Sequence, residues 1–136
     1  MNTSSNSEHN RIVVLDTETT GMNLEGGPHY MGHRIIEIGA VEIINRKLTG
    51  RHFHVYLKPD REIQPDAIGV HGITDEFLVD KPEYSAVHQE FLDFIKGAEL
   101  VAHNAPFDTG FMDYEFEMLN PGIGKTDDYC KVTDTL

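Results

Sequence analysis

The sequence predicts an α/β domain built on a mixed sheet. Three apolar, β-branched segments stand close together early in the chain, and this spacing indicates a three-stranded antiparallel meander. The pattern then changes to apolar residues three and four positions apart, which is typical of helices, with two short strands among them. Alternating helices and strands after a meander favour a mixed sheet with helices packed on it. The expected order is βββαβαβ.

The meander strands are expected at Arg11–Asp16, Arg34–Asn45 and Arg51–Leu57. Between the first two strands, the segment 17–32 contains four glycines and a proline and is predicted to be a turn and loop. Between the second and third strands, Arg46–Gly50 is expected to be a tight connection.

Two short helical stretches are expected next, around Asp66–Gly69 and Asp75–Val79. A longer helix follows and ends at Gly97, as glycine commonly ends helices. One face of this helix is apolar and carries Tyr84, Val87, Phe91, Phe94 and Ile95.

The last elements are a strand at Glu99–His103, a helix at Phe107–Leu119 and a strand at Tyr129–Val132. The aromatic residues of the helix have helical spacing, so we expect them to pack in the core rather than to stack on bases. Thr133 resembles a helix N-cap with Asp134 in the first turn. Because that helix would lie beyond the last residue, we expect the domain to be incomplete at its C-terminal end.

The length and composition predict one globular domain, because 136 residues are too few for two ordinary domains. Residues 1–10 are polar and aperiodic, so we expect a disordered tail there and the folded domain at 11–136. No apolar run suits a signal peptide or a membrane span. A single cysteine, Cys130, fits a reducing compartment, and we expect a cytoplasmic protein without a membrane partner.

The net charge of −12 argues against a protein that grips DNA through a broad basic face. Two explanations are open. Either the chain does not contact nucleic acid, or bound metal ions and partner subunits supply the positive charge.

Asp16, Thr17 and Glu18 form the first chemical motif, at the end of the first strand. Residues two apart on a strand point to the same side, so both carboxylates face one point. Two carboxylates held together repel each other, and a hard divalent cation with oxygen ligands relieves that repulsion. The alternative is a pair of solvated turn acids, which are common on protein surfaces.

Asp108 belongs to the second motif, His103–Asp108, at a junction between a strand and a helix. Sites of α/β sheets lie at this edge, although an acid in a first helical turn is often a simple cap. Taken with Asp16 and Glu18, it completes three acids from two strand ends. Such a set suits a two-metal site for attack on a phosphodiester.

Several segments resemble the epsilon family of proofreading exonucleases of bacterial DNA polymerase III, which belongs to the DEDD exonucleases. The resemblance runs from about Arg11 to the last residue and is carried by LDTETTGM, HRIIEIGAVEIINRKLTG, FHVYLKPD, GVHGITDEFL and HNAPFDTGFMDYEF. It implies a ribonuclease H-like fold. The implied activity is stepwise hydrolysis of a single-stranded 3′ end of DNA with Mg²⁺ or Mn²⁺, which releases mononucleotides.

The resemblance assigns the catalytic and metal-binding roles to three carboxylates, Asp16, Glu18 and Asp108. The first two also contact substrate. Thr17 is implied to contact the terminal nucleotide through its backbone. Asp66 and His71 fall where the family contacts that nucleotide, although the family more often has glutamate at the first of these positions.

The family's final motif is H-x4-D in a later helix, which supplies a general base and a fourth carboxylate, and we expect that helix to lie beyond the last residue. His103 and Asp108 have the same spacing, but they straddle the junction of a strand and a helix. Because a positioned base contributes roughly 10²–10⁴-fold in rate, we expect this chain to be impaired. If it is active, His71 is the first candidate for the base. Family partners are the polymerase catalytic subunit, a small accessory subunit and the clamp. The alternatives are a non-catalytic partner-binding module and an RNA-trimming exonuclease.

Overall fold

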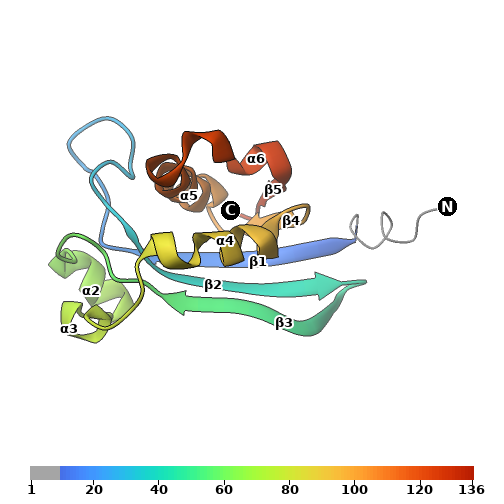
Figure 1. The fold of residues 1–136 in the computed structure, drawn as a ribbon, viewed down its shortest axis with the longest axis horizontal. Coiled ribbons are helices and arrows are strands. Elements are labelled where there is room, and N and C mark those ends of the chain that lie inside the picture. Colours follow the sequence, from blue (N-terminus) through green and yellow to red (C-terminus); the bar gives the residue numbers. More distant parts are fainter. Residues whose placement is uncertain (1–9) are drawn as a thin grey trace.

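The strands lie in the order β3-β2-β1-β4-β5 within one sheet (Figure 1). The computed structural model describes residues 10–136, so the expected disordered tail, except Asn10, lies outside the described residues. The strands are β1 (Arg11–Thr19), β2 (Ile35–Ile44), β3 (Lys47–Tyr56), β4 (Glu99–Ala102) and β5 (Lys131–Asp134). The helices are α2 (Pro65–His71), α3 (Asp75–Leu78), α4 (Tyr84–Ile95), α5 (Ala105–Leu119) and α6 (Thr126–Tyr129), with a 3₁₀ turn at Pro121–Ile123.

The pairing confirms the mixed sheet. Strands β1, β2 and β3 form an antiparallel meander, whereas β4 and β5 add parallel to β1 and to each other. Strand β4 pairs with Ile12–Val14 only, so residues 15–19 of β1 extend beyond it and have a strand partner on the β2 side alone. This free edge is where the two acids of the first motif lie.

The core lies on one face of the sheet, beneath α4 and α5 (Figure 1). Alternation along β1 sends Val13 and Leu15 into this core and leaves Val14 partly exposed on the other face. Phe91 of α4 and Phe111 of α5 are fully buried against these strands. Burial of an aromatic or aliphatic side chain contributes roughly 1.5–3 kcal/mol, so this layer holds the helices on the sheet. Helices α2 and α3 close a second, smaller apolar cluster at one end of the sheet.

The connection between β2 and β3 is shorter than expected. Asn45 and Arg46 both have positive φ, and β3 already begins at Lys47. Two residues with positive φ suit the twist of a two-residue hairpin. The prediction of a connection at Arg46–Gly50 was wrong because the start of β3 is exposed and carries no apolar alternation.

The C-terminal signal was also misread. Thr133 and Asp134 do not begin a helix but lie in β5, where Asp134 pairs with Ala102. The Asp134 carboxylate accepts hydrogen bonds from the backbone N–H groups of Asn104 and Ala105, at 2.9 and 3.1 Å. The acid therefore caps the N-terminus of α5, and this capping carboxylate comes from β5 rather than from the helix itself.

Helix α6 was not predicted, because a single turn at Thr126–Tyr129 is too short to show a helical period. Within residues 10–136, no helix combines the length and the apolar character that crossing a membrane requires.

Candidate functional site

The free edge of β1 meets the first turn of α5. Helix α5 follows β4, and β1 extends past β4, so Thr17 and Asp108 come together there. Both residues are buried, and the Thr17 hydroxyl donates a hydrogen bond to the Asp108 carboxylate. This contact joins the two predicted motifs.

Burial and neighbouring charge perturb these acids. Burial raises the pKa of Asp108 to about 6, the hydrogen bond from Thr17 opposes this, and the charges of Asp16 and Glu18 add to it. The pKa of Glu18 is raised as well, first by burial and then by Asp16. Burial, with a smaller contribution from neighbouring carboxylate charge, therefore disfavours the ionised forms of Asp108 and Glu18, and a bound cation would offset this cost.

The three acids do not form one compact ligand set. Thr17 points toward Asp108 on the helix side of β1, and alternation sends Asp16 and Glu18 to the other side. Among residues 10–136, no group of three or more His, Cys, Asp or Glu side chains is placed to hold a metal ion. The ligand assignment stays a prediction. The chemistry of the donors, carboxylate oxygens with mutual repulsion, fits a hard divalent cation.

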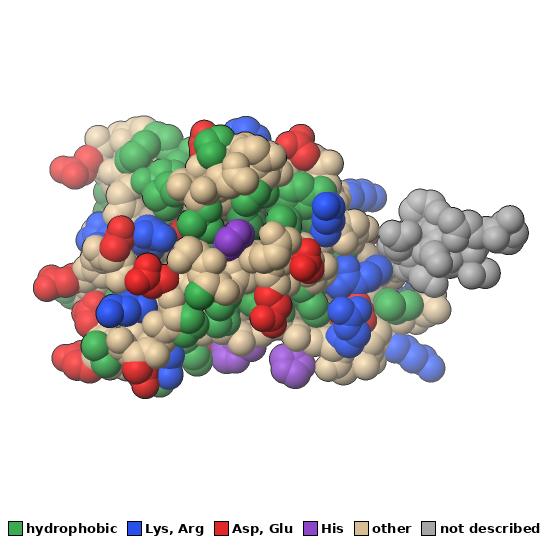
Figure 2. All heavy atoms as spheres, viewed as in Figure 1, with side chains coloured by type: hydrophobic (Ala, Val, Ile, Leu, Met, Phe, Trp, Pro, Cys, Tyr) green, Lys and Arg blue, Asp and Glu red, His purple; other side chains and the backbone are tan. Residues whose placement is uncertain are grey.

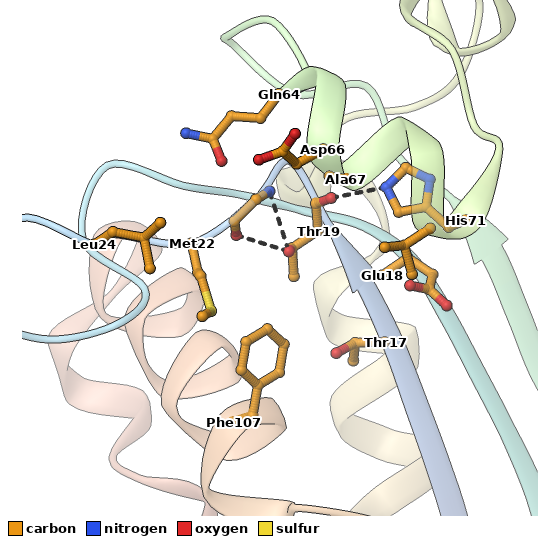
Figure 3. Close-up of a pocket in the computed structure, with 12 residues that line it drawn as sticks. Thr17, Glu18, Thr19, Met22, Leu24, Gln64, Asp66, Ala67, His71 and Phe107 are labelled. Carbon is orange, nitrogen blue, oxygen red and sulfur yellow. Dashed lines mark hydrogen bonds between the residues drawn. The ribbon is translucent and has the colours of Figure 1, made fainter.

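A cleft of about 350 Å³ opens beside the acids (Figure 3). Its floor is the end of β1, one wall is α2, and the opposite side is made by the loop after β1 and the start of α5. The lining residues are Thr17, Glu18, Thr19, Gly21, Met22, Leu24, Gln64, Asp66, Ala67, Val70, His71 and Phe107. Of the predicted site residues, Thr17, Glu18, Asp66 and His71 line this cleft, whereas Asp16 and Asp108 do not.

His71 is held by both ring nitrogens. Its Nε2 lies 3.1 Å from the carbonyl oxygen of Thr19 (Figure 3). Its Nδ1 accepts a hydrogen bond from the N–H of Ile73 at 3.0 Å. Because a carbonyl only accepts, Nε2 carries the proton and donates it. Neither nitrogen is free to accept a proton from water in this geometry. The ring instead links α2 to the end of β1.

Sequence reasoning missed the apolar side chains of the cleft. Leu24 and Val70 are 78% and 85% exposed, and neither belongs to a periodic pattern that marks a site. Phe107 was expected in the core with the other aromatic residues of its helix. Phe111 and Phe116 are indeed buried, and Phe107, one turn before Phe111, packs against the core at the same time as it lines the cleft. The sequence feature that could have indicated a site role for Phe107 is its position next to Asp108, a predicted site residue.

Comparison with known proteins identifies the family of the chain. A family model described as exonuclease (RNase_T) matches residues 13–136. The chain belongs to this exonuclease family. It is 67% identical over 126 residues to DNA polymerase III subunit epsilon of Escherichia coli (strain K12), covering 93% of this chain and 51% of that protein. It is 68% identical over 127 residues to DNA polymerase III subunit epsilon of Haemophilus influenzae, covering 93% of this chain and 49% of that protein. The chain thus spans about half the length of the curated relatives it matches.

Solved exonuclease structures share the fold. Escherichia coli exonuclease I in complex with a 5cy-dA13 oligonucleotide aligns with a TM-score of 0.76 at 19% identity, over 94% of this chain and 28% of that one. A 3′-exonuclease described in 3′-end-specific recognition of a histone mRNA stem-loop aligns with a TM-score of 0.65 at 17% identity, over 85% and 43%. The expected ribonuclease H-like exonuclease fold is confirmed.

Proposed function

We propose that this exonuclease chain removes nucleotides from the 3′ end of DNA, as a proofreading domain of the epsilon type. The observation that carries the proposal is the cleft beside the end of β1, where apolar side chains face one another within reach of Glu18. A pocket of this size with apolar walls and a few polar groups suits a small ligand such as a nucleotide.

Asp16, Glu18 and Asp108 are the residues that would hold Mg²⁺ or Mn²⁺. Bound divalent ions would offset the carboxylate repulsion and stabilise the charge that develops on the phosphate oxygens. Thr17 holds Asp108 in place through its hydroxyl, and this hydrogen bond favours the ionised form that metal binding requires.

The remaining residues orient the terminal nucleotide. Phe107 and Leu24 present apolar surface to one side of the cleft and Val70 presents it to the other. Such surface suits the faces of a base, which stack on aromatic and apolar side chains. His71 stabilises the carbonyl of Thr19 at the floor, and Asp66 stands exposed at the start of α2. We assign these residues to nucleotide binding.

Proton transfer from the attacking water is the step that this geometry supports least. Both nitrogens of His71 are occupied, so its assignment as a base is not supported by this geometry. We therefore propose that the chain by itself releases nucleotides more slowly than a complete site with a positioned base would. The difference in rate should be the roughly 10²–10⁴-fold that such a base contributes.

The charge distribution supports delivery of the DNA end by partners. Figure 2 shows acidic side chains spread over one face, with a group of basic side chains at the end where β2 and β3 meet and others among the acids at the opposite end. With a net charge of −12, the chain lacks the excess of basic residues that non-specific DNA binding requires. We propose that the polymerase catalytic subunit, the small accessory subunit and the clamp are its partners, because its curated relatives are polymerase III subunits.

The test is nucleotide release from a single-stranded 3′ end in Mn²⁺, with DNA and RNA compared. Asp16→Ala should abolish release. Asp93→Ala removes the same charge from an exposed position of α4 and should leave release unchanged. Release that survives Asp16→Ala would refute the assigned site, and a preference for RNA would favour an RNA-trimming enzyme. No release from the unmodified chain would favour a non-catalytic partner-binding module.

A further inference from the structure

We propose that His29 is a positioning residue that holds Phe107 and the loop after β1 together as one wall of the cleft. The identity of the ligand rests on the function proposed above, whereas the position of the wall is argued from contacts within the chain alone. His29 itself does not line the cleft, so it acts on a bound molecule only through Phe107 and the loop.

The ring of His29 lies on α5. It stacks on Phe107 with a centroid distance of 5.2 Å and an interplanar angle of 24°, and its edge meets Phe111 at 5.6 Å. Its Nε2 lies 3.1 Å from the carbonyl oxygen of Phe107 and, facing an acceptor, must donate. The stacking restrains the Phe107 ring, and the hydrogen bond ties the His29 ring to the backbone of the same residue.

Gly110 makes this contact possible. A Cβ added there would lie 2.6 Å from Cε1 of His29 and 2.8 Å from its Nε2, closer than nonbonded atoms approach. Glycine inside a helix costs about 0.5–1 kcal/mol relative to alanine. Gly110 has ordinary helical φ, so the turn geometry does not require glycine. The close approach of His29 does.

The loop is tied to His29 by its own hydrogen bonds. The N–H of Asn23 donates to the carbonyl of His29 at 2.7 Å, and the Asn23 side-chain amide donates to the carbonyls of Gly26 and Pro28 at 2.7 and 3.1 Å. These bonds close residues 23–29 into a unit. Met22 and Leu24, which line the cleft, flank the anchoring Asn23. A shift of His29 therefore moves both contributors to this wall.

The wall sets the width available to a bound nucleotide. Phe107 and Leu24 stand opposite α2, which contributes Val70 (Figure 3). If His29 is removed, Phe107 gains freedom to turn. Of the loop's ring contacts with α5, only those of Tyr30 with Phe111 and Tyr114 then remain. The cleft should then bind nucleotide more weakly, while the carboxylates on β1 and the Thr17–Asp108 contact stay in place.

The experiment compares His29→Ala, Gly110→Ala and the double variant with the unmodified chain. Affinity for dTMP in Mn²⁺ and affinity for Mn²⁺ alone are measured by calorimetry, and the mobility of the Met22 and Leu24 methyl groups by NMR without metal. Each single variant should bind dTMP about tenfold more weakly, with Mn²⁺ affinity unchanged and more mobile methyl groups. Adding Gly110→Ala to His29→Ala should cause little further loss, because the closest contacts of the new methyl group are to His29 and only the edge of Tyr30, 3.2 Å away at Cδ2, then remains. His29→Phe, which keeps the stacking, should recover most of the affinity.

The outcomes separate the two proposals. Methyl groups in His29→Ala as rigid as in the unmodified chain would overturn the positioning role, whether or not dTMP binds. Equal loss of dTMP and Mn²⁺ affinity would also overturn it, since that marks a general structural defect. If the unmodified chain binds no dTMP, the proposed function fails, and the methyl mobility still decides the role of His29. Additive losses in the double variant would show that His29 and Gly110 act separately and would overturn the contact.

Discussion

The hydroxyl of Thr17 donates a hydrogen bond to the carboxylate of Asp108, which lies 91 positions away in the sequence. This contact holds the start of α5 against the free edge of β1. It also lowers the pKa of Asp108, against the larger effect of burial, which raises it. The site therefore depends on a neutral side chain as well as on its acids.

Replacing Thr17 by valine keeps the shape of the side chain and removes the donor. The pKa of Asp108 should then rise further above about 6. A hydrogen bond to a charged group contributes about 1.5–3 kcal/mol, so Mn²⁺ affinity near pH 6.5 should fall about tenfold or more. Calorimetric titration with Mn²⁺ checks this. Thr49→Val removes a hydroxyl that donates to buried Glu42 at the far end of the sheet, and should leave Mn²⁺ affinity unchanged. Equal losses in both variants would contradict the prediction.

Metal binding should weaken in acid. Divalent ions bind the ionised carboxylates, and the folded protein protonates Asp108 near pH 6 rather than near the usual 3.8. Mn²⁺ affinity should therefore be full well above pH 6 and fall as the pH drops through that value. In Asp108→Asn, affinity should be lower at pH 8 and its decline with acid shallower. The raised pKa of Glu18 leaves some decline in that variant. A flat profile between pH 7 and 5 in the unmodified chain would count against the assignment of Asp108.

His71→Ala should affect binding more than turnover. Because both ring nitrogens are engaged, the side chain orients the floor of the cleft rather than taking a proton. In steady-state kinetics with single-stranded DNA and Mn²⁺, KM should rise, and kcat should fall by less than about tenfold. Removing a true general base would lower kcat by roughly 10²–10⁴-fold, and a loss of that size would restore His71 as the base.

Glu115→Ala should destabilise the fold. The buried carboxylate of Glu115 accepts hydrogen bonds from Nε and Nη2 of Arg34 at 2.9 and 2.8 Å, and from the N–H of Ile35 at 2.9 Å. Removing Glu115 leaves the buried N–H of Ile35 without this acceptor. It also leaves Arg34 with only its ion pair to exposed Asp60, at 3.0 Å, so the free energy of unfolding should drop by about 3 kcal/mol. Urea unfolding measures this. Glu117→Ala, an exposed position on the same helix, should change stability by less than about 0.5 kcal/mol, and a similar loss there would contradict the prediction.

The fold class could be predicted from the sequence because it depends on local patterns. The apolar run before Asp16 and the helical spacing around Phe91 indicate a strand and a helix without knowledge of their neighbours. The close spacing of the first three strands leaves little choice except an antiparallel meander. Short elements such as β5 and α6 lack a readable period, and their bounds were misplaced or missed.

The sequence by itself determined where the candidate residues stand in their elements, since the spacing of Asp16 and Glu18 and the helix-start position of Asp108 are local features; that these residues carry the chemistry stays a prediction. The tertiary structure decided what surrounds them. Only folding shows that Asp134 caps α5, that both nitrogens of His71 are occupied, and that Phe107 faces a cleft. These facts depend on contacts between segments far apart in the chain, and such contacts follow from strand register and helix packing, which no local pattern specifies.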